Sequence, residues 1–379
     1  MNAIQPLIDK RRFIGLDAVA HLCAGGEAPP LQSHAEAAAR FLADKADAMD
    51  GRARFFDVRA RAKRLLSGLL RLPPTDIAIL LNASDGMATA VAGLDLAARD
   101  NIVVARSDYV SLSLSARRRV GTEGELRLAG SSITTSIASY EPLVDDRTRA
   151  VLVSHVCYLS GIYHDLAAFR ALADRVGARL IVDVSHSLGA VPIDGTLCDA
   201  LVSCCYKWQL GVHGCGVFAV NHVRWPDLDP AAWGWNTIEH DENWHDREGF
   251  RLKTDAERFE TGNPPFLALY LLENGLSALM ETDETTRASH IRALSGAVLD
   301  LLTEAGIDPV TPASPETRAG NVAYLCADPK SMVDRLRASG VLIWGGEGRV
   351  RISTHVYNDM ADIEALRRAL HPIAAQRPP

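Results

Sequence analysis

The sequence predicts an α/β fold built on a large, mostly parallel sheet, followed by a smaller α+β region. Two observations predict it: from about residue 75 short apolar runs alternate with helical patterns, and those runs are apolar throughout rather than at every second residue. Such strands are typical of parallel sheets covered by helices on both faces. The chain has 379 residues, of which 47% are hydrophobic and 23% charged, so it can bury a large core.

The expected strands of the large sheet are short and apolar, and they cover residues 77–82, 102–105, 150–155, 179–184, 200–205 and 216–220. Helical patterns between them include residues 86–98 and 165–177. The second pattern has Asp165 near its start and Gly177 just past its end, which suits caps.

The chain changes character after the last of these strands. Residues 221–264 are rich in Trp, Asp, His and Pro and show little periodicity. Helical patterns over 266–281 and 284–305 then lead into a strand, helix, strand and helix between residues 321 and 370. We therefore expect a large domain over 30–265 and a smaller domain from 1–29 and 266–379.

Composition excludes several classes of protein. The 40 Lys and Arg against 47 Asp and Glu give a net charge of −7, which argues against nucleic acid as a partner. No segment approaches the roughly 18 uninterrupted apolar residues of a membrane span, and the amino-terminal region does not resemble a signal peptide. The seven cysteines, two of them adjacent, do not form a disulfide framework. A reducing cytoplasm is the expected setting.

Polar residues that follow the strands are candidates for a binding site, because open α/β sheets bind ligands beyond the carboxyl ends of their strands. Ser84 and Asp85 open a helix whose backbone N–H groups could hold a phosphate, although either residue could simply cap that helix. Asp183 and His186 end another strand. A buried carboxylate there needs a partner or water, because an isolated buried charge is costly.

Lys207 follows the next strand, between Tyr206 and Trp208 and before a glycine-rich turn. An enclosed lysine can form Schiff bases. A phosphate-type turn, a strand-end aspartate and an enclosed lysine, in that order, are the groups that pyridoxal phosphate (PLP) requires.

Residues 180–220 contain the pieces D-x-x-H-S-x-G-A-x-P and Y-K-W at a fixed separation. With them the chain, from about residue 15 to 370, resembles a fold-type I PLP enzyme of the class V aminotransferase family. Relatives in that family include kynureninase, selenocysteine lyase, cysteine desulfurase and isopenicillin N epimerase. The resemblance implies a large domain with a seven-stranded type of sheet and a smaller carboxyl-terminal domain.

The resemblance also implies roles for individual residues. Lys207 would form the internal aldimine, Asp183 would keep the pyridinium nitrogen protonated, and His186 would lie near the phenolic oxygen. Ser84 and Asp85 occupy the position of a Thr-Glu pair at the phosphate.

Further cofactor and substrate contacts follow from the same resemblance. Tyr109 matches the ring that stacks on the pyridine, and Tyr206 matches a phosphate-contacting tyrosine of kynureninases. Gly262 and Asn263 match a segment that reaches the cofactor phosphate of the neighbouring subunit, where the family usually has Thr in place of Asn263. Arg351 matches the arginine that binds the substrate carboxylate.

Two departures from the family pattern bear on the reaction. Cysteine desulfurases carry a nucleophilic cysteine on a loop before the arginine, whereas the run VLIWGGEGRVR here has none, and Cys326 is expected in the core. This disfavours cysteine desulfurase. Tyr158 stands near the position where some relatives place an Asn against the cofactor.

Other interpretations of the same residues are weaker. The GVHGCG run (211–216) does not match a dinucleotide-binding motif. Cys204 and Cys205 are adjacent on a strand and point to opposite faces, so a zinc site there is disfavoured and no metal is expected.

The expected protein is a homodimer with shared active sites that acts on an amino acid through an external aldimine and a quinonoid. We expect a lyase that acts at the β or γ position, by elimination or by C–C or C–S cleavage. Aminotransferase or epimerase activity is the close alternative, and a catalytically silent ligand-binding homologue is the second.

Overall fold

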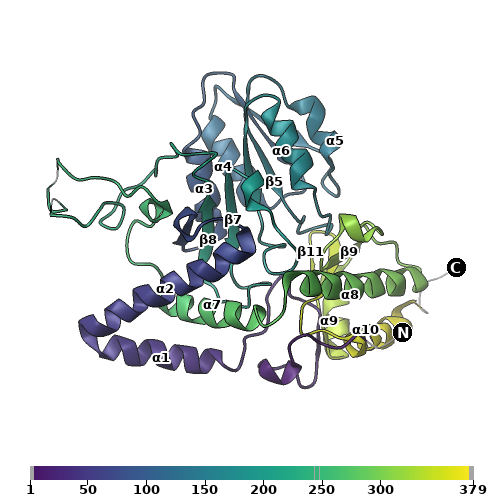
Figure 1. Ribbon diagram of the computed structural model, residues 1–379. Coiled ribbons are helices and arrows are strands. Elements are labelled where there is room, and N and C mark those ends of the chain that lie inside the picture. Colours follow the sequence, from purple (N-terminus) through teal and green to yellow (C-terminus); the bar gives the residue numbers. More distant parts are fainter. Residues whose placement is uncertain (1–3, 243, 247, 375–379) are drawn as a thin grey trace.

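The structure is a computed structural model that describes residues 4–242, 244–246 and 248–374 (Figure 1). Its largest element is a seven-stranded sheet. The strand order is β2 (Ile77–Leu80), β8 (Gly216–Val220), β7 (Ala200–Cys204), β6 (Arg179–Asp183), β5 (Thr148–Ser154), β3 (Asn101–Ala105) and β4 (Glu125–Ala129). Strand β8 runs antiparallel to both neighbours and all other pairs are parallel. The predicted mostly parallel sheet is confirmed.

Two apolar layers cover the sheet, because successive strand residues point to opposite faces. On one face Ile102 and Val104 belong to a cluster with α3 (Ala83–Ala92) and α4 (Val110–Val120). On the other face Val103 and Ala105 belong to a cluster with α2 (Ala48–Leu70) and α6 (Leu166–Asp174). The strands are therefore buried on both sides, which explains their continuous hydrophobicity.

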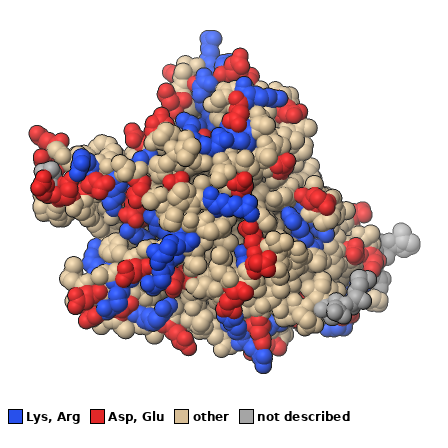
Figure 2. All heavy atoms as spheres, viewed as in Figure 1, with Lys and Arg blue, Asp and Glu red and all other residues tan. Residues whose placement is uncertain are grey.

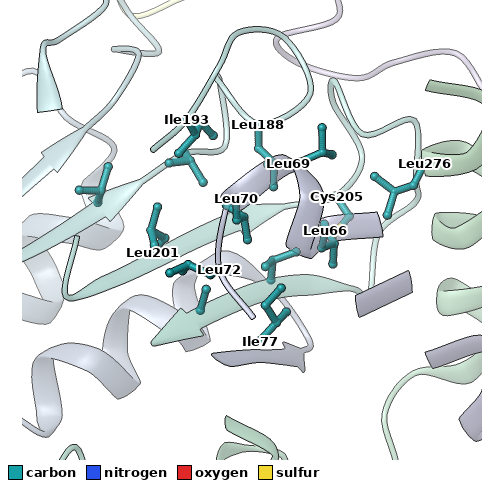
Figure 3. Packing of buried hydrophobic residues seen from close by; sticks show 14 of the residues in the cluster. Leu66, Leu69, Leu70, Leu72, Ile77, Leu188, Ile193, Leu201, Cys205 and Leu276 are labelled. Carbon is teal, nitrogen blue, oxygen red and sulfur yellow. The ribbon is translucent and has the colours of Figure 1, made fainter. Parts of the chain in front are cut away.

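The last turns of α2 pack against the sheet (Figure 3). Leu66, Leu69 and Leu70 on its last turns are almost completely buried, and they belong to the same cluster as Ile77 and Leu201 of the sheet. Removing such a side chain costs about 2–5 kcal/mol, so this contact fixes α2 on the sheet. The site described below lies at the carboxyl ends of strands β6 and β7.

Helices α1 (His34–Ala46) and α2 form an antiparallel pair that extends to one side of the molecule beside α7 (Phe266–Leu279) (Figure 1). The sequence analysis assigned neither α1 nor α2. It also missed β4, whose burial is low until Ala129. Edge strands and helices with long charged side chains show weak apolar periodicity, which is the physical reason for these omissions.

A second group of elements follows α7. Strands β11 (Trp344–Gly346), β12 (Arg349–Ser353) and β9 (Asn321–Leu325) form an antiparallel sheet, with β12 in the middle. Helices α8 (Glu284–Glu304), α9 (Pro329–Ala338) and α10 (Met360–Ala374) accompany it. Amino-terminal strand β1 (Ala20–His21) pairs with β10 (Val341–Leu342), so the two ends of the chain meet in this region. The exact domain division remains a prediction.

One local expectation needs adjustment. The helix expected at 86–98 is α3, which begins at Ala83 because the Asn82 side chain accepts a hydrogen bond from the backbone N–H of Asp85. Neither Ser84 nor Asp85 caps it. Segment 221–264 is irregular, as expected, apart from a short 3-10 helix at Ala256–Phe259 within its described residues.

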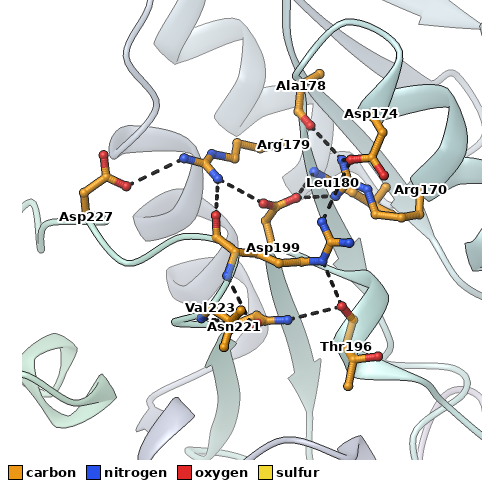
Figure 4. Close-up of polar contacts among 11 residues, drawn as sticks. Arg170, Asp174, Ala178, Arg179, Leu180, Thr196, Asp199, Asn221, Val223 and Asp227 are labelled. Carbon is orange, nitrogen blue, oxygen red and sulfur yellow. Dashed lines mark hydrogen bonds and ion pairs between the residues drawn. The ribbon is translucent and has the colours of Figure 1, made fainter.

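A buried ion pair network ties β6, β7 and α6 together (Figure 4). Asp199 is buried and accepts hydrogen bonds from Arg170 Nη1 (2.5 Å), Arg179 Nη1 (3.1 Å) and the backbone N–H of Leu180 (2.7 Å). Arg170 is buried as well. Removal of Asp199 would therefore leave the buried Arg170 guanidinium with Asp174, which is 55% exposed and lies 2.8 Å away, as its carboxylate partner.

We expect Asp199→Ala to lower the free energy of unfolding by about 3 kcal/mol, because Arg170 loses its buried carboxylate partner and the backbone N–H of Leu180 loses its acceptor. Urea unfolding followed by circular dichroism measures this. Asp227→Ala is the control, since Asp227 is 79% exposed and lies 3.6 Å from Arg179, and its unfolding midpoint should stay that of the parent. Equal midpoints for both variants would contradict the role given to Asp199.

Surface charge is mixed. On the face in Figure 2, acidic and basic side chains lie side by side over most elements. Within the part of the chain that the structure describes, no helix is long and apolar enough to cross a membrane.

Candidate active site

A cavity of about 120 Å³ lies at the carboxyl ends of β6 and β7, next to the first turns of α3 and α4. This is the edge at which parallel sheets bind ligands. Several of the predicted residues line the cavity together: Ser84, Tyr109, Asp183, His186, Tyr206 and Lys207. The structure thus brings together residues that are up to 123 positions apart.

Asp183 is the last residue of β6 and is buried. One of its carboxylate oxygens, Oδ1, accepts a hydrogen bond from the backbone N–H of Ser185 at 2.8 Å. A second buried carboxyl group, Asp108, accepts from the backbone N–H of Ser154, which pairs with Asp183 across the sheet. Burial, together with the nearby carboxylate of Asp183, raises the pKa of Asp108 to about 7. The sequence analysis did not identify Asp108.

Lys207 lies in the loop after β7 and contacts His186. Its Nζ atom is 3.0 Å from His186 Nε2 and 5.5 Å from the centroid of the Tyr206 ring. Burial lowers the pKa of His186 well below its ordinary value, and the charges of Lys207 and Arg351 lower it further. The imidazole is therefore neutral at neutral pH.

Two helices begin at the same wall of the cavity. Ser84 on the first turn of α3 and Ser111 on the first turn of α4 are joined by a hydrogen bond of 2.7 Å between their Oγ atoms. Helix starts carry free backbone N–H groups and partial positive charge, which favour anions. Together with the Tyr206 hydroxyl, this donor set fits a phosphate group. Asp85 does not line the cavity, because its Oδ2 accepts from Asn82 Nδ2.

Aromatic rings form the rim. Tyr109 is 48% exposed, and its ring meets that of Tyr158 edge to face at 5.3 Å. The Tyr158 hydroxyl donates to Glu347 Oε2 at 2.9 Å rather than pointing to Lys207. Tyr158 therefore contributes to the entrance of the site.

Arg351 comes from the middle strand β12 and is 3% exposed. Its Nη1 donates to the carbonyl oxygen of Tyr158 at 2.8 Å, its guanidinium carbon lies 4.7 Å from the centroid of the Trp344 ring, and its Nε has no partner among the described residues. Burial lowers the pKa of Arg351 to about 10, so it stays protonated at neutral pH. The guanidinium thus retains donors for an anionic ligand.

The amino-terminal segment lies against this arginine. A Cβ atom on Gly25 would be 2.7 Å from Asn321 Oδ1 and Ser353 Oγ and 3.1 Å from Arg351 Nε, so a side chain here would force its neighbours to shift. Cys23 lies two residues earlier. Burial raises the pKa of its thiol, and the nearby Arg351 guanidinium partly offsets this increase. Cys23 pairs with Ser353 of β12 by an isolated bridge.

Gly262 and Asn263 are not at the Lys207 cavity of their own chain. They line a separate cavity of about 310 Å³ with Asp85, on the other side of the first turn of α3. Asn263 Oδ1 accepts from Arg52 Nη2 at 2.9 Å. Their contact with a partner's cofactor remains a prediction.

Sequence reasoning also missed Asn321 and Ser353, which connect β9 and β12 to His186. One signal was available for Ser353: in the R-V-R-I-S run, positions 349, 351 and 353 share a face of the strand. No comparable signal marked Asn321. Among the described residues no cluster of His, Cys, Asp and Glu side chains is placed to hold a metal ion.

Comparison with known proteins identifies relatives of this chain. The family model "Aminotransferase class-V" matches residues 46–366. The uncharacterized aminotransferase YcbU of Bacillus subtilis (strain 168) is 25% identical over 329 residues, 83% of each chain. The kynureninase of Pseudomonas fluorescens is 27% identical over 206 residues, which is 52% of this chain and about half, 49%, of that enzyme. The apo structure of a cysteine desulfurase from Thermococcus onnurineus NA1 has a TM-score of 0.87 at 18% identity, over 97% of this chain and 98% of the other.

The expectation that disfavoured cysteine desulfurase is wrong. A solved cysteine desulfurase shares the fold over nearly the whole chain, so the fold does not separate this protein from cysteine desulfurases. The sequence argument considered only the residues that precede Arg351 along the chain, whereas the structure places the Cys23 thiol near that arginine from the opposite end of the sequence. Cys326 is half-buried and packs against the core of the carboxyl-terminal region, as expected.

The match covers more than half of the chain, and the cavity offers a lysine, a strand-end aspartate and a phosphate-type wall. These are the groups that the cofactor of this family requires. The chain therefore belongs to the class V aminotransferase family of PLP-dependent enzymes.

Proposed function

We propose that the protein is an amino acid lyase that holds PLP at Lys207 and breaks a bond at the β or γ carbon of its substrate. The observation that carries the proposal is the 3.0 Å contact between Lys207 Nζ and His186 Nε2 in the cavity that Asp183 also lines. An amine, a neutral imidazole and a carboxylate in one buried pocket are suited to proton transfer at neutral pH.

When bound, PLP supplies an aldehyde that bonds to amines and a ring that accepts electrons. Ser84, Ser111 and Tyr206 would hold its phosphate at the starts of α3 and α4. Asp183 would keep a proton on the ring nitrogen, and Tyr109 would cover one face of the ring. His186 would lie at the phenolic oxygen.

Lys207 has two roles in this proposal. It would hold the cofactor, and as a free amine it would move the proton at the substrate Cα. Arg351 binds the substrate carboxylate with the donors that the protein leaves free, while the Tyr158 carbonyl and the Trp344 ring hold the guanidinium in place. This fixes which Cα bond faces Lys207.

Similarity to kynureninases favours cleavage, since the blocks around His186 and Lys207 are the kynureninase-like parts of the sequence. Aminotransferase activity is the second candidate, because the relative with the longest match of those above is named an aminotransferase. Epimerase activity shares the same first proton transfer.

A panel of amino acids tested with the purified holoenzyme separates these reactions. We expect ammonia with a 2-oxo acid, or alanine with a released group, without consumption of any acceptor. A strict requirement for a 2-oxo acid would instead show transamination, and loss of optical rotation alone would show epimerisation. If no amino acid reacts and the protein only binds ligand, the enzyme proposal fails.

We also propose a homodimer, in which Gly262 and Asn263 of one subunit approach the cofactor of the other. The support is their position in a cavity on the far side of Asp85 and the hydrogen bond that fixes Asn263 to Arg52. Analytical ultracentrifugation should give twice the 41.0 kDa chain mass. A monomer with full activity would contradict the shared site.

A further inference from the structure

A chain of three side-chain contacts leads from the carboxyl-terminal sheet to Lys207. Ser353 Oγ donates to Asn321 Oδ1 at 2.8 Å, Asn321 Nδ2 lies 2.9 Å from His186 Nδ1, and His186 Nε2 lies 3.0 Å from Lys207 Nζ. Asn321 and Ser353 are both fully buried, and they face each other across strands β9 and β12. No step of the proposed reaction uses Asn321 or Ser353.

The direction of the hydrogen bonds follows from the chemistry of the groups. The Asn321 amide nitrogen can only donate, so His186 Nδ1 must accept. A neutral imidazole carries one proton, which is then on Nε2 and points to Lys207. Nε2–H can donate to Lys207 Nζ only if that nitrogen has a free electron pair. The lysine that fits this arrangement is the uncharged amine.

In the structure the Asn321 amide has Oδ1 toward Ser353 Oγ and Nδ2 toward His186 Nδ1. The Ser353 hydroxyl occupies Oδ1, and Gly25 lies so close that a Cβ atom there would be 2.7 Å from both Asn321 Oδ1 and Ser353 Oγ. With the opposite orientation, the amide nitrogen would face the serine and Oδ1 would face the imidazole. The position of the proton on His186 would then be reversed.

Other charged and titratable groups around the pair favour a neutral imidazole. Burial and the positive charge of Arg351 of β12 both act against a charged His186, and Tyr158 lies at 6.5 Å between ring centroids. The ring of Tyr206 lies over Lys207, and His355 interacts with the Lys207 backbone. Within these described surroundings, an imidazolium would be buried beside the Arg351 cation.

We propose that Asn321 is a positioning residue that holds the proton of His186 on Nε2 and thereby presents Lys207 as a free amine. The free amine attacks the aldehyde carbon of the cofactor, a carbon–nitrogen bond forms, and one water molecule leaves. The inference rests on the proposed function, since it concerns the same lysine. It assigns to the carboxyl-terminal sheet a direct effect on the reactivity of Lys207.

Asn321→Asp tests this inference, because the carboxylate has the same shape but can only accept a hydrogen bond. It should draw the proton to Nδ1 and leave Nε2 as an acceptor, which favours the ammonium form of Lys207. The rate of PLP capture by the cofactor-free protein is measured by absorbance. We expect this rate to fall about tenfold at pH 7, and the pH profile of the rate to move up by about one unit. Ser353→Ala should cause a smaller slowing.

Asn274→Asp is the matched control. The amide nitrogen of Asn274 donates to Ser33 Oγ at 2.8 Å on α7, away from the cavity, so this variant adds the same charge without touching His186. Its PLP capture should equal that of the parent. An unchanged rate and pH profile in Asn321→Asp would overturn the inference.

A second measurement is made on the parent protein and needs a variant only to assign the signal. In parent protein labelled with 15N-histidine, two-bond 1H–15N spectra distinguish the two neutral forms of the ring, and loss of one signal in His186→Asn assigns it. We expect His186 to carry its proton on Nε2. A proton on Nδ1 would overturn the inference while leaving the proposed function intact, whereas a parent protein that captures no PLP would overturn the proposed function itself.

Discussion

Lys207→Ala should abolish turnover, with kcat at least about 10²–10⁴-fold below the parent, because the general base at Cα is lost. It should also lose the yellow colour of the protein, since no other amine in the cavity can bond to the aldehyde: Lys207 is the only lysine among its described lining residues. Turnover of the best substrate from the amino acid panel and the absorbance spectrum of the purified variant measure both effects.

Lys330→Ala serves as the control for Lys207→Ala. Lys330 is exposed on α9 and pairs with Asp334, so its loss should leave activity and colour unchanged. If Lys207→Ala kept its turnover, the role of this lysine as base would be refuted. If the variant lost turnover and colour but still bound a ligand tightly, the protein would also have a binding function that does not need Lys207.

Arg351→Gln should lower kcat/KM for amino acids by about 10²–10³-fold, because truncating a buried charge partner typically costs about 2–5 kcal/mol. The loss arises from the substrate carboxylate, which would enter the cleft without a cation. PLP capture should be unaffected, since Arg351 is not among the residues that line the Lys207 cavity.

An amine that lacks the carboxylate provides the control for Arg351→Gln. The PLP-loaded parent and the PLP-loaded variant should react with that amine at equal, slow rates. A variant that loses the same factor on both compounds would show that Arg351 acts through structure rather than by binding the carboxylate.

The sequence allowed prediction of those parts of the site that lie next to a strand end. Asp183, His186 and Lys207 each follow a continuous apolar run, and runs of this kind are buried strands whose carboxyl ends share one edge. The first turn of α3 was recognised for the same reason, although its cap is Asn82 because backbone geometry, not residue type alone, decides which side chain meets the free N–H groups.

Contacts between distant segments were not predictable in this way. Asn321 contacts His186 although the two residues are 135 positions apart. Cys23 lies near Arg351 because β1, just before Cys23, pairs with β10 of the carboxyl-terminal region. Neither contact leaves a local pattern, since each depends on how the two sheets are packed. Helices α1 and α2 were missed because their charged residues hide the apolar stripe that contacts α7.

Arg351 illustrates both situations. Its place on a strand with alternating polar residues was visible in the sequence. Its partners were not: the Tyr158 carbonyl, the Trp344 ring and the glycines of the amino-terminal segment come from three different parts of the chain. The free donors of the guanidinium, on which substrate binding depends, became apparent only with these partners in place.

Reduction of the holoenzyme with borohydride, followed by proteolysis and mass spectrometry, tests the central claim most directly. The reagent makes a cofactor–lysine bond permanent. We predict a phosphopyridoxyl group on the peptide that contains Lys207, at one group per chain. A cofactor-saturated protein in which Lys207 is unmodified, or in which another lysine carries the label, would contradict the account.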